Sequence, residues 1–277
     1  MLVPIQPSGT KPPLFFIHGA NGLMPVGKSF SRVLGPDQPL YIFNARGYDG
    51  EEKPRETVEE MVSDYVAEIT QVAPTGPLAI GGMCWGTMIA LEAGRELQAK
   101  GRSLGPIILA DPPRVPYGKG ENPQEMGMAV PQGAGGMTTE VEKQLYNYTR
   151  GALMTHASLP YNEMPFDARN QDQLHAATLT GMACTAALSR FSAKMFLGNV
   201  ELIINTNVAP VFFGPNMPWQ RVLPNPRVAH VVPWGHVDMF RSKRFEMARL
   251  IKFILDSAFS PPVADAAAER ERERTFA

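Results

Sequence analysis

The sequence predicts an α/β protein in which helices flank a mostly parallel sheet. Three observations support this fold class. Short apolar runs alternate with amphipathic helical stretches over the first 111 residues. One apolar run enters a helix through a cysteine between glycines, at residues 82–86. Finally, Cys84, Asp111 and His236 each follow a predicted strand. Because the carboxyl ends of parallel strands lie at one edge of a sheet, we expect these three side chains to meet there.

Four short apolar runs in the first half predict buried strands. They are residues 14–17, 40–43, 77–80 and 106–110. One connecting helix begins with a capping box, in which the Thr57 hydroxyl and the Glu60 carboxylate bind free backbone amides. Its apolar residues recur at helical spacing as far as Val72. Another helix is predicted over 87–100, directly after the cysteine. Strands joined through helices in this order form a parallel sheet with right-handed crossovers.

The alternation of strands and helices stops after Asp111. Residues 112–200 contain prolines, a glycine-rich stretch at 132–136 and helical pieces rich in methionine and leucine. We interpret this interval as a helical lid insertion. Its methionines are adaptable apolar side chains, which either line a tunnel or pack the lid onto the core.

The alternation resumes after the insertion. We predict strands over 209–213 and 227–232, separated by a helix or turn, and a helix over 241–255. The tail at 261–277 alternates glutamate and arginine and is predicted to be a flexible terminus. We expect the chain, residues 1–277, to form one domain.

The composition argues against several function classes. The 26 basic and 27 acidic residues give a net charge of −1, so no overall positive field attracts nucleic acid or anionic lipid. No apolar segment approaches the ~20 residues that a membrane span needs, and residues 1–13 have no signal-peptide pattern. The two cysteines, Cys84 and Cys184, predict no disulfide framework. No cysteine–histidine cluster has zinc-like spacing. We therefore expect a cytoplasmic protein without a metal or a bound cofactor.

The sequence Gly-Met-Cys-Trp-Gly at 82–86 has the form of a nucleophile elbow, with cysteine at the position where serine is usual. In such an elbow a strand turns sharply into a helix and raises one side chain above the sheet edge. Side chains two residues before and after the nucleophile would clash, which explains Gly82 and Gly86. A small buried cysteine is the alternative interpretation of Cys84. The motifs elsewhere in the chain favour the interpretation of Cys84 as a nucleophile.

Cys84, Asp111 and His236 follow the chain order nucleophile, acid, histidine. Cys84 would be the nucleophile, and the start of the following helix would stabilise its thiolate. His236 would move the proton, and Asp111 would orient the imidazole and stabilise its cation. The other place considered for the acid follows residues 211–213, where residues 214–217 contain no carboxylate.

Other titratable residues are weaker candidates. His230 alternates within a predicted strand, and His156 and His175 lie in the insertion. Asp238 lies near the histidine but is expected to cap the following helix. A His-Gly turn at 18–19, after the first strand, predicts an oxyanion hole. Its two donors would be the backbone amides of Ala20 and Trp85.

The chain resembles the thioesterase domains that end nonribosomal peptide synthetases and polyketide synthases, which have the α/β-hydrolase fold. The resemblance rests on residues 15–19, 45–52, 81–86, 109–113 and 235–236. It is strong over 14–111 and looser over 205–255, and the insertion has no match. Two positions depart from the family pattern. Cys84 replaces the serine of most members, and Thr87 replaces a glycine that is common after the elbow.

The resemblance implies an acyl or peptidyl substrate held as a phosphopantetheine thioester by a carrier protein. Cys84 would accept the acyl group, with Ala20 and Trp85 stabilising the oxyanion. Exchange of one thioester for another keeps the acyl group activated. We therefore expect release by hydrolysis or, beyond hydrolysis, by cyclisation or transfer to another nucleophile.

Three alternatives stay open. The chain could be a polyester-forming acyltransferase that uses acyl-CoA, although it is short for one and its acid lies close behind the nucleophile. It could be a lactone hydrolase with a cysteine nucleophile. The non-enzymatic alternative is a hydrolase-fold binding protein, which predicts a broken triad or oxyanion element that the sequence does not show.

Overall fold

The computed structural model describes residues 1–114, 140–157, 167–207, 209, 218–224 and 228–260. Within them, seven strands form one sheet in the order β1-β3-β2-β4-β5-β6-β7. The strands are β1 (Leu2–Gln6), β2 (Leu14–Ile17), β3 (Leu40–Phe43), β4 (Leu78–Met83), β5 (Leu104–Ala110), β6 (Val200–Asn205) and β7 (Val228–Val232). Only β1 is antiparallel to its neighbour, so the predicted parallel sheet is confirmed.

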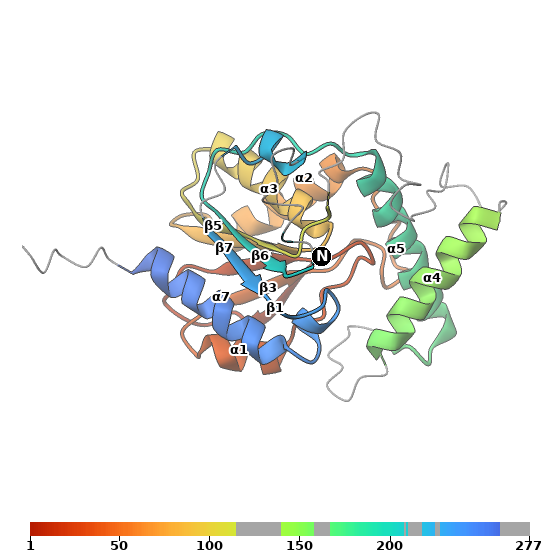
Figure 1. The fold of residues 1–277 in the computed structure, drawn as a ribbon. Coiled ribbons are helices and arrows are strands. Elements are labelled where there is room, and N and C mark those ends of the chain that lie inside the picture. The colour runs from red at the N-terminus through yellow and green to blue at the C-terminus, as the bar shows by residue number, and fades with distance from the viewer. Residues whose placement is uncertain (115–139, 158–166, 208, 210–217, 225–227, 261–277) are drawn as a thin grey trace, which may run out of the picture.

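Helices cover both faces of this sheet (Figure 1). On one face lie α2 (Val58–Val72) and α3 (Gly86–Ala99), and on the other α1 (Lys28–Leu34) and α7 (Arg244–Phe259). Between β5 and β6, in the interval of the predicted insertion, α4 (Glu140–Ala157) and α5 (Gln171–Arg190) lie side by side. Short 3-10 turns occur at Pro218–Arg221 and Asp238–Phe240. Together these elements form the α/β-hydrolase arrangement.

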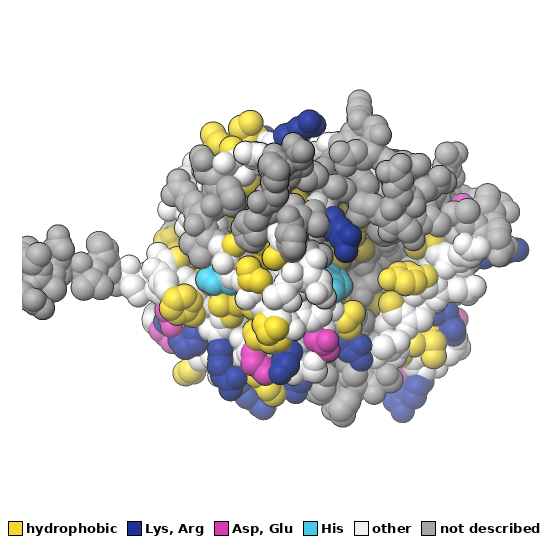
Figure 2. Space-filling view, in the orientation of Figure 1, with side chains coloured by type: hydrophobic (Ala, Val, Ile, Leu, Met, Phe, Trp, Pro, Cys, Tyr) yellow, Lys and Arg dark blue, Asp and Glu magenta, His cyan; other side chains and the backbone are white. Residues whose placement is uncertain are grey.

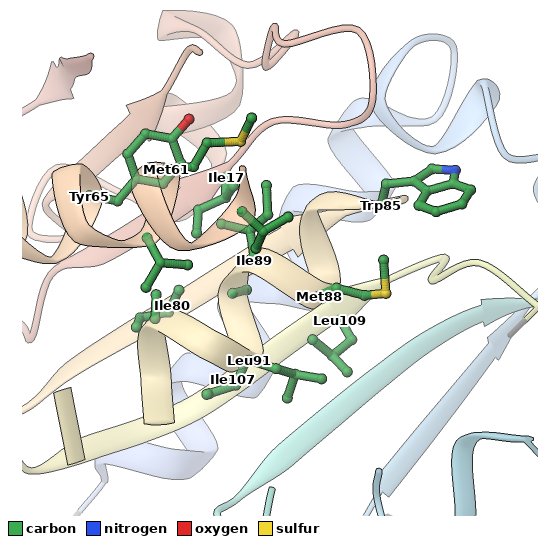
Figure 3. Close-up of a cluster of buried hydrophobic side chains, with 14 of the residues drawn as sticks. Ile17, Met61, Tyr65, Ile80, Trp85, Met88, Ile89, Leu91, Ile107 and Leu109 are labelled. Carbon is green, nitrogen blue, oxygen red and sulfur yellow. The ribbon is translucent and has the colours of Figure 1, made fainter. Parts of the chain in front are cut away.

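The local signals read from the sequence explain several of these elements. The Thr57 Oγ1 accepts a hydrogen bond from the Glu60 amide at 3.2 Å, and Glu60 Oε2 accepts one from the Thr57 amide at 3.1 Å. This is the predicted capping box at the start of α2. The apolar face of α2 then packs on α3 and the sheet. Figure 3 shows Met61 and Tyr65 of α2 beside Ile89 of α3, with Ile80 of β4 close by.

The strand between the insertion and β7 differs from the prediction. We expected residues 209–213 to fill this place, and most of them lie outside the described residues. The place between β5 and β7 is held by β6, which pairs with both in parallel. Its apolar residues follow directly on the insertion, and Glu201 interrupts them, so the alternation signal is weak. The element that bears on the site is therefore β6, which ends at Asn205.

Two segments with predictions lie outside the described residues. These are the glycine-rich stretch at 132–136 and the tail at 261–277. On the face drawn in Figure 2, basic and acidic side chains are interspersed along the lower margin, in keeping with a net charge of −1. Among the described helices, none has the length and apolar character to cross a membrane.

Candidate active site

Cys84 lies at the sharp turn between β4 and α3. Its φ is +56°, a left-handed conformation that side chains other than glycine rarely adopt. The Cys84 amide donates to the Ala110 carbonyl of the neighbouring strand at 2.8 Å. A Cβ atom added at Gly82 would lie 2.3 Å from the Gly86 oxygen, and one at Gly86 would lie 1.9 Å from the His18 oxygen. Only glycine fits at both places, which is the steric pattern of a nucleophile elbow.

Asp111 follows β5, the strand beside β4. It also has a positive φ, +47°, and its amide donates to the Ile203 carbonyl of β6 at 2.7 Å. His236 follows β7, two strands further along the sheet. Its Nδ1 lies 2.5 Å from Asp111 Oδ2, and the Cys84 side chain is near enough to favour the positive charge of the ring. The structure thus brings together the three residues that the sequence singled out. Their catalytic roles stay predictions.

The environment of His236 favours its positive charge. Burial opposes that charge, but hydrogen bonds to Asp111 and Cys84, with the charges of both groups, outweigh the burial and raise the pKa of His236 to about 10. The His236 side chain is 41% exposed, so a reactant can approach it from solvent. The arrangement therefore places a protonated imidazole between the Cys84 side chain and the Asp111 carboxylate.

Asn205, at the end of β6, is a further hydrogen-bond partner of Asp111. Its Nδ2 donates to Asp111 Oδ1 at 2.8 Å, and its own Oδ1 accepts from the Asn207 amide at 2.9 Å. Both oxygens of the Asp111 carboxylate are thereby hydrogen-bonded, one to Asn205 and the other to His236. Asn205 was not predicted as a site residue, because β6 was not predicted as a strand. A polar residue that ends an apolar run at this sheet edge is the signal that could have found it.

The His18-Gly19 turn lies against the elbow. A Cβ atom added at Gly19 would be 3.6 Å from the Cys84 Cβ. Among the described residues, the Ala20 amide has no hydrogen-bond acceptor. Trp85 is the N-cap residue of α3, directly after Cys84. The turn that holds Ala20 thus lies beside Cys84, and Trp85 follows Cys84 at the start of α3; the two amides stay predicted oxyanion donors.

The remaining candidates have structural partners elsewhere. His230 pairs with Glu201 across β6 and β7 at 2.9 Å, and His175 contacts the Tyr146 hydroxyl between α4 and α5 at 2.8 Å. The His156 side chain lies outside the described part of the chain. Asp238 accepts a hydrogen bond from the Ser242 hydroxyl at 2.7 Å, within the turn before α7. None of these described pairs includes a residue of the candidate triad.

Thr87 is one of the two departures from the family pattern. It is fully buried in the first turn of α3, and its hydroxyl donates to the Cys84 carbonyl at 2.6 Å. The side chain thus adds a second bond to the carbonyl that the Thr87 amide also binds, at 3.2 Å.

In the residues that the structure describes, no cluster of His, Cys, Asp and Glu could hold a metal ion.

Comparison with known proteins identifies the family of this chain. The family model described as "Thioesterase domain" matches residues 12–257. The chain belongs to the thioesterase domain family. The matches to curated relatives cover less than half of this chain. Malpinin synthetase of Mortierella alpina is 33% identical over 133 residues, which are 46% of this chain and 2% of that protein. The dimodular nonribosomal peptide synthase of Bacillus subtilis (strain 168) is 32% identical over 111 residues, 40% of this chain and 5% of that protein.

Solved thioesterase domains have the same fold. The NocB thioesterase domain, solved in a covalent complex with a fluorophosphonate nocardicin G analog, superposes with a TM-score of 0.65. It is 20% identical, and the match covers 92% of this thioesterase domain and 99% of that chain. The surfactin thioesterase domain SrfTE superposes with a TM-score of 0.61 at 17% identity, covering 91% and 95%. This agreement confirms the predicted α/β-hydrolase fold.

Proposed function

We propose that this thioesterase domain releases an acyl or peptidyl chain from a phosphopantetheine thioester on a carrier protein, through an acyl-enzyme on Cys84. The observation that carries the proposal is the chain of contacts from Asp111 through His236 to Cys84, at a strained elbow. Membership of the thioesterase domain family supports the reaction class. The curated relatives, which are peptide synthetases and related synthetases many times longer than this chain, support a carrier-bound substrate.

In the first step, the Cys84 thiolate attacks the thioester carbonyl. The Ala20 and Trp85 amides stabilise the oxyanion that forms. As the tetrahedral intermediate collapses, the carbon–sulfur bond to phosphopantetheine breaks, and the departing thiolate takes a proton from the His236 imidazolium. The products are a free carrier thiol and an acyl group in thioester linkage to Cys84. His236 is left neutral and hydrogen-bonded to Asp111, ready to act as a base.

In the second step, neutral His236 takes a proton from the attacking nucleophile. The nucleophile is water or a hydroxyl or amine of the acyl chain itself. Its bond to the carbonyl carbon forms, and the Cys84 thiolate leaves beside the regenerated imidazolium. Because the sulfur-linked intermediate is about as activated as the incoming thioester, this step favours ring closure or amide formation, which an oxygen ester drives less strongly.

The substrate class is tested by assaying the same acyl group on three kinds of leaving group. These are a phosphopantetheinylated carrier protein, coenzyme A and a lactone. We expect the carrier-bound thioester to be released with the highest kcat/KM. A higher value for the CoA thioester or the lactone would overturn the carrier assignment in favour of an acyl-CoA enzyme or a lactone hydrolase.

The role of sulfur is tested with Cys84→Ser and a substrate that carries an internal nucleophile. We expect the serine variant to shift the product from cyclised or transferred chain towards the hydrolysed acid. Equal product ratios at comparable rates would show that cysteine has no special role here. Cys184→Ser is the matched control, because burial raises the pKa of the Cys184 thiol to about 12 and keeps that residue out of the chemistry.

A further inference from the structure

His18 is buried completely, although it belongs to the turn beside the elbow. Both of its ring nitrogens have partners. Nδ1 lies 2.7 Å from the Gly19 carbonyl oxygen, and Nε2 lies 2.6 Å from the Tyr65 hydroxyl. A carbonyl oxygen can only accept, so Nδ1 carries the hydrogen and donates to Gly19. In the neutral ring Nε2 is then an acceptor, and the Tyr65 hydroxyl donates to it.

The bond to Gly19 acts on the same peptide unit that contains the Ala20 amide. The Gly19 carbonyl and the Ala20 N–H belong to one planar trans peptide and point in opposite directions. The Gly22 amide also donates to the Gly19 oxygen, at 3.1 Å. These two donors hold the carbonyl on the side of His18, so the Ala20 N–H must face the other way. Hydrogen bonding at the carbonyl also polarises the peptide and strengthens its N–H as a donor.

We propose that His18 and Tyr65 are positioning residues that orient the Ala20 amide as an oxyanion donor. This inference rests on the proposed function, in which the Ala20 amide binds the oxyanion. Tyr65 comes from α2, 47 residues further along the chain, so the helix holds the Nε2 side of the His18 ring from outside the turn. The pair acts only through the peptide unit and touches no reacting atom.

The electrostatics of the pair suit a fixed neutral relay. Burial lowers the pKa of His18 to about 4, so its ring is uncharged at neutral pH. Burial also raises the pKa of Tyr65 well above its usual value, so its hydroxyl keeps its proton. A cationic His18 would place a hydrogen on Nε2 and break the acceptor role towards Tyr65.

The test compares two reactions of Cys84 in the same variants. Acylation by a carrier-bound or N-acetylcysteamine thioester passes through an oxyanion, whereas alkylation by iodoacetamide does not. Loss of one oxyanion donor slows turnover by about 10²–10³-fold. By that scale, we expect His18→Leu to slow acylation about 100-fold and Tyr65→Phe about tenfold. Alkylation should stay within about twofold of wild type, and KM should change little while kcat falls.

His18→Asn is the rescue variant, because its side-chain amide can still donate to the Gly19 carbonyl. We expect it to recover most of the acylation rate that His18→Leu loses. The inference is overturned if wild type is acylated and both variants, Tyr65→Phe and His18→Leu, are acylated as fast as wild type. It is also overturned if alkylation falls in parallel, since that marks a general distortion of the elbow. Wild type that is alkylated but never acylated would instead contradict the proposed function.

Discussion

Cys84 and Asp111 are, among the described residues, the two non-glycine positions with a positive φ. They lie at the ends of the neighbouring strands β4 and β5, and the Cys84 amide bonds the carbonyl of Ala110, directly before Asp111. A left-handed conformation costs roughly 1–2 kcal/mol at a non-glycine residue. Two such costs at adjacent strand ends indicate that the fold tolerates backbone strain here because it places these two side chains.

The first prediction concerns Asp111→Asn. Asparagine tolerates the left-handed conformation as well as aspartate does, so the backbone should persist while the negative charge is lost. Without the carboxylate, His236 loses its orienting acceptor and the charge that stabilises its cation. We expect kcat to fall by about 10²–10⁴-fold, and the free energy of unfolding to fall by about 1–3 kcal/mol, because one buried hydrogen bond of Asp111 is lost. A kcat near wild type would remove Asp111 from the site.

Asn205→Ala is the second change. It deletes the donor to Asp111 Oδ1 and leaves that buried oxygen without its partner. We expect kcat to fall about tenfold, and the free energy of unfolding to fall by about 1–3 kcal/mol. Urea denaturation and steady-state kinetics measure the two effects. Asn207→Ala, at an exposed neighbouring position, is the matched control and should change neither quantity. Equal effects at both positions would contradict the role given to Asn205.

The raised pKa of His236 predicts a pH profile for alkylation of Cys84 by iodoacetamide. Because the His236 pKa is raised to about 10, the imidazolium is present at neutral pH and is lost as the pH rises through about 10. Its support for the thiolate follows the same course. We expect His236→Ala to slow alkylation at least about tenfold at neutral pH, with the two rates converging above about pH 10. His230→Ala, in β7, should match wild type throughout. A pH-independent ratio of the two rates would argue against the ion pair.

Gly86→Ala tests the steric reason for the elbow. The new Cβ atom would lie 1.9 Å from the His18 oxygen, which is backbone and cannot move aside cheaply. We expect a loss of more than about 3 kcal/mol of stability or failure to fold, since overpacking of this kind already costs about 1–3 kcal/mol. Gly151→Ala, in α4 with open space around it, should instead gain about 0.5–1 kcal/mol. Thermal denaturation compares the two, and a stable, active Gly86→Ala protein would refute the steric argument.

The sequence carried the local features of the site well. Two of these features depend only on residues that are close in the sequence: the glycines Gly82 and Gly86 around Cys84, and the capping box at Thr57. They could therefore be predicted from the sequence alone. The strand Val200–Asn205 was missed because Glu201 interrupts its apolar run directly after the insertion. Asn205 was missed together with this strand, and its contact with Asp111 spans 94 residues.

Two further elements gave little signal in the sequence. The edge strand β1, with a proline at position 4, and the short helix α1, which has no side-chain cap, are set by packing in the fold. The contact between His18 and Tyr65 likewise depends on how α2 lies over the sheet. Patterns of a few residues predict turns and caps, whereas such long-range pairs require the three-dimensional structure.

The central claim is that Cys84 carries the acyl group during turnover. Intact-mass spectrometry of the chain, rapidly quenched with a carrier-bound thioester, tests it most directly, with peptide mapping to locate the adduct. The account predicts a mass increase equal to the acyl group on the peptide that contains Cys84, present in Cys184→Ser and absent in Cys84→Ala. An acyl adduct on another residue, or release at the wild-type rate by Cys84→Ala, would contradict it.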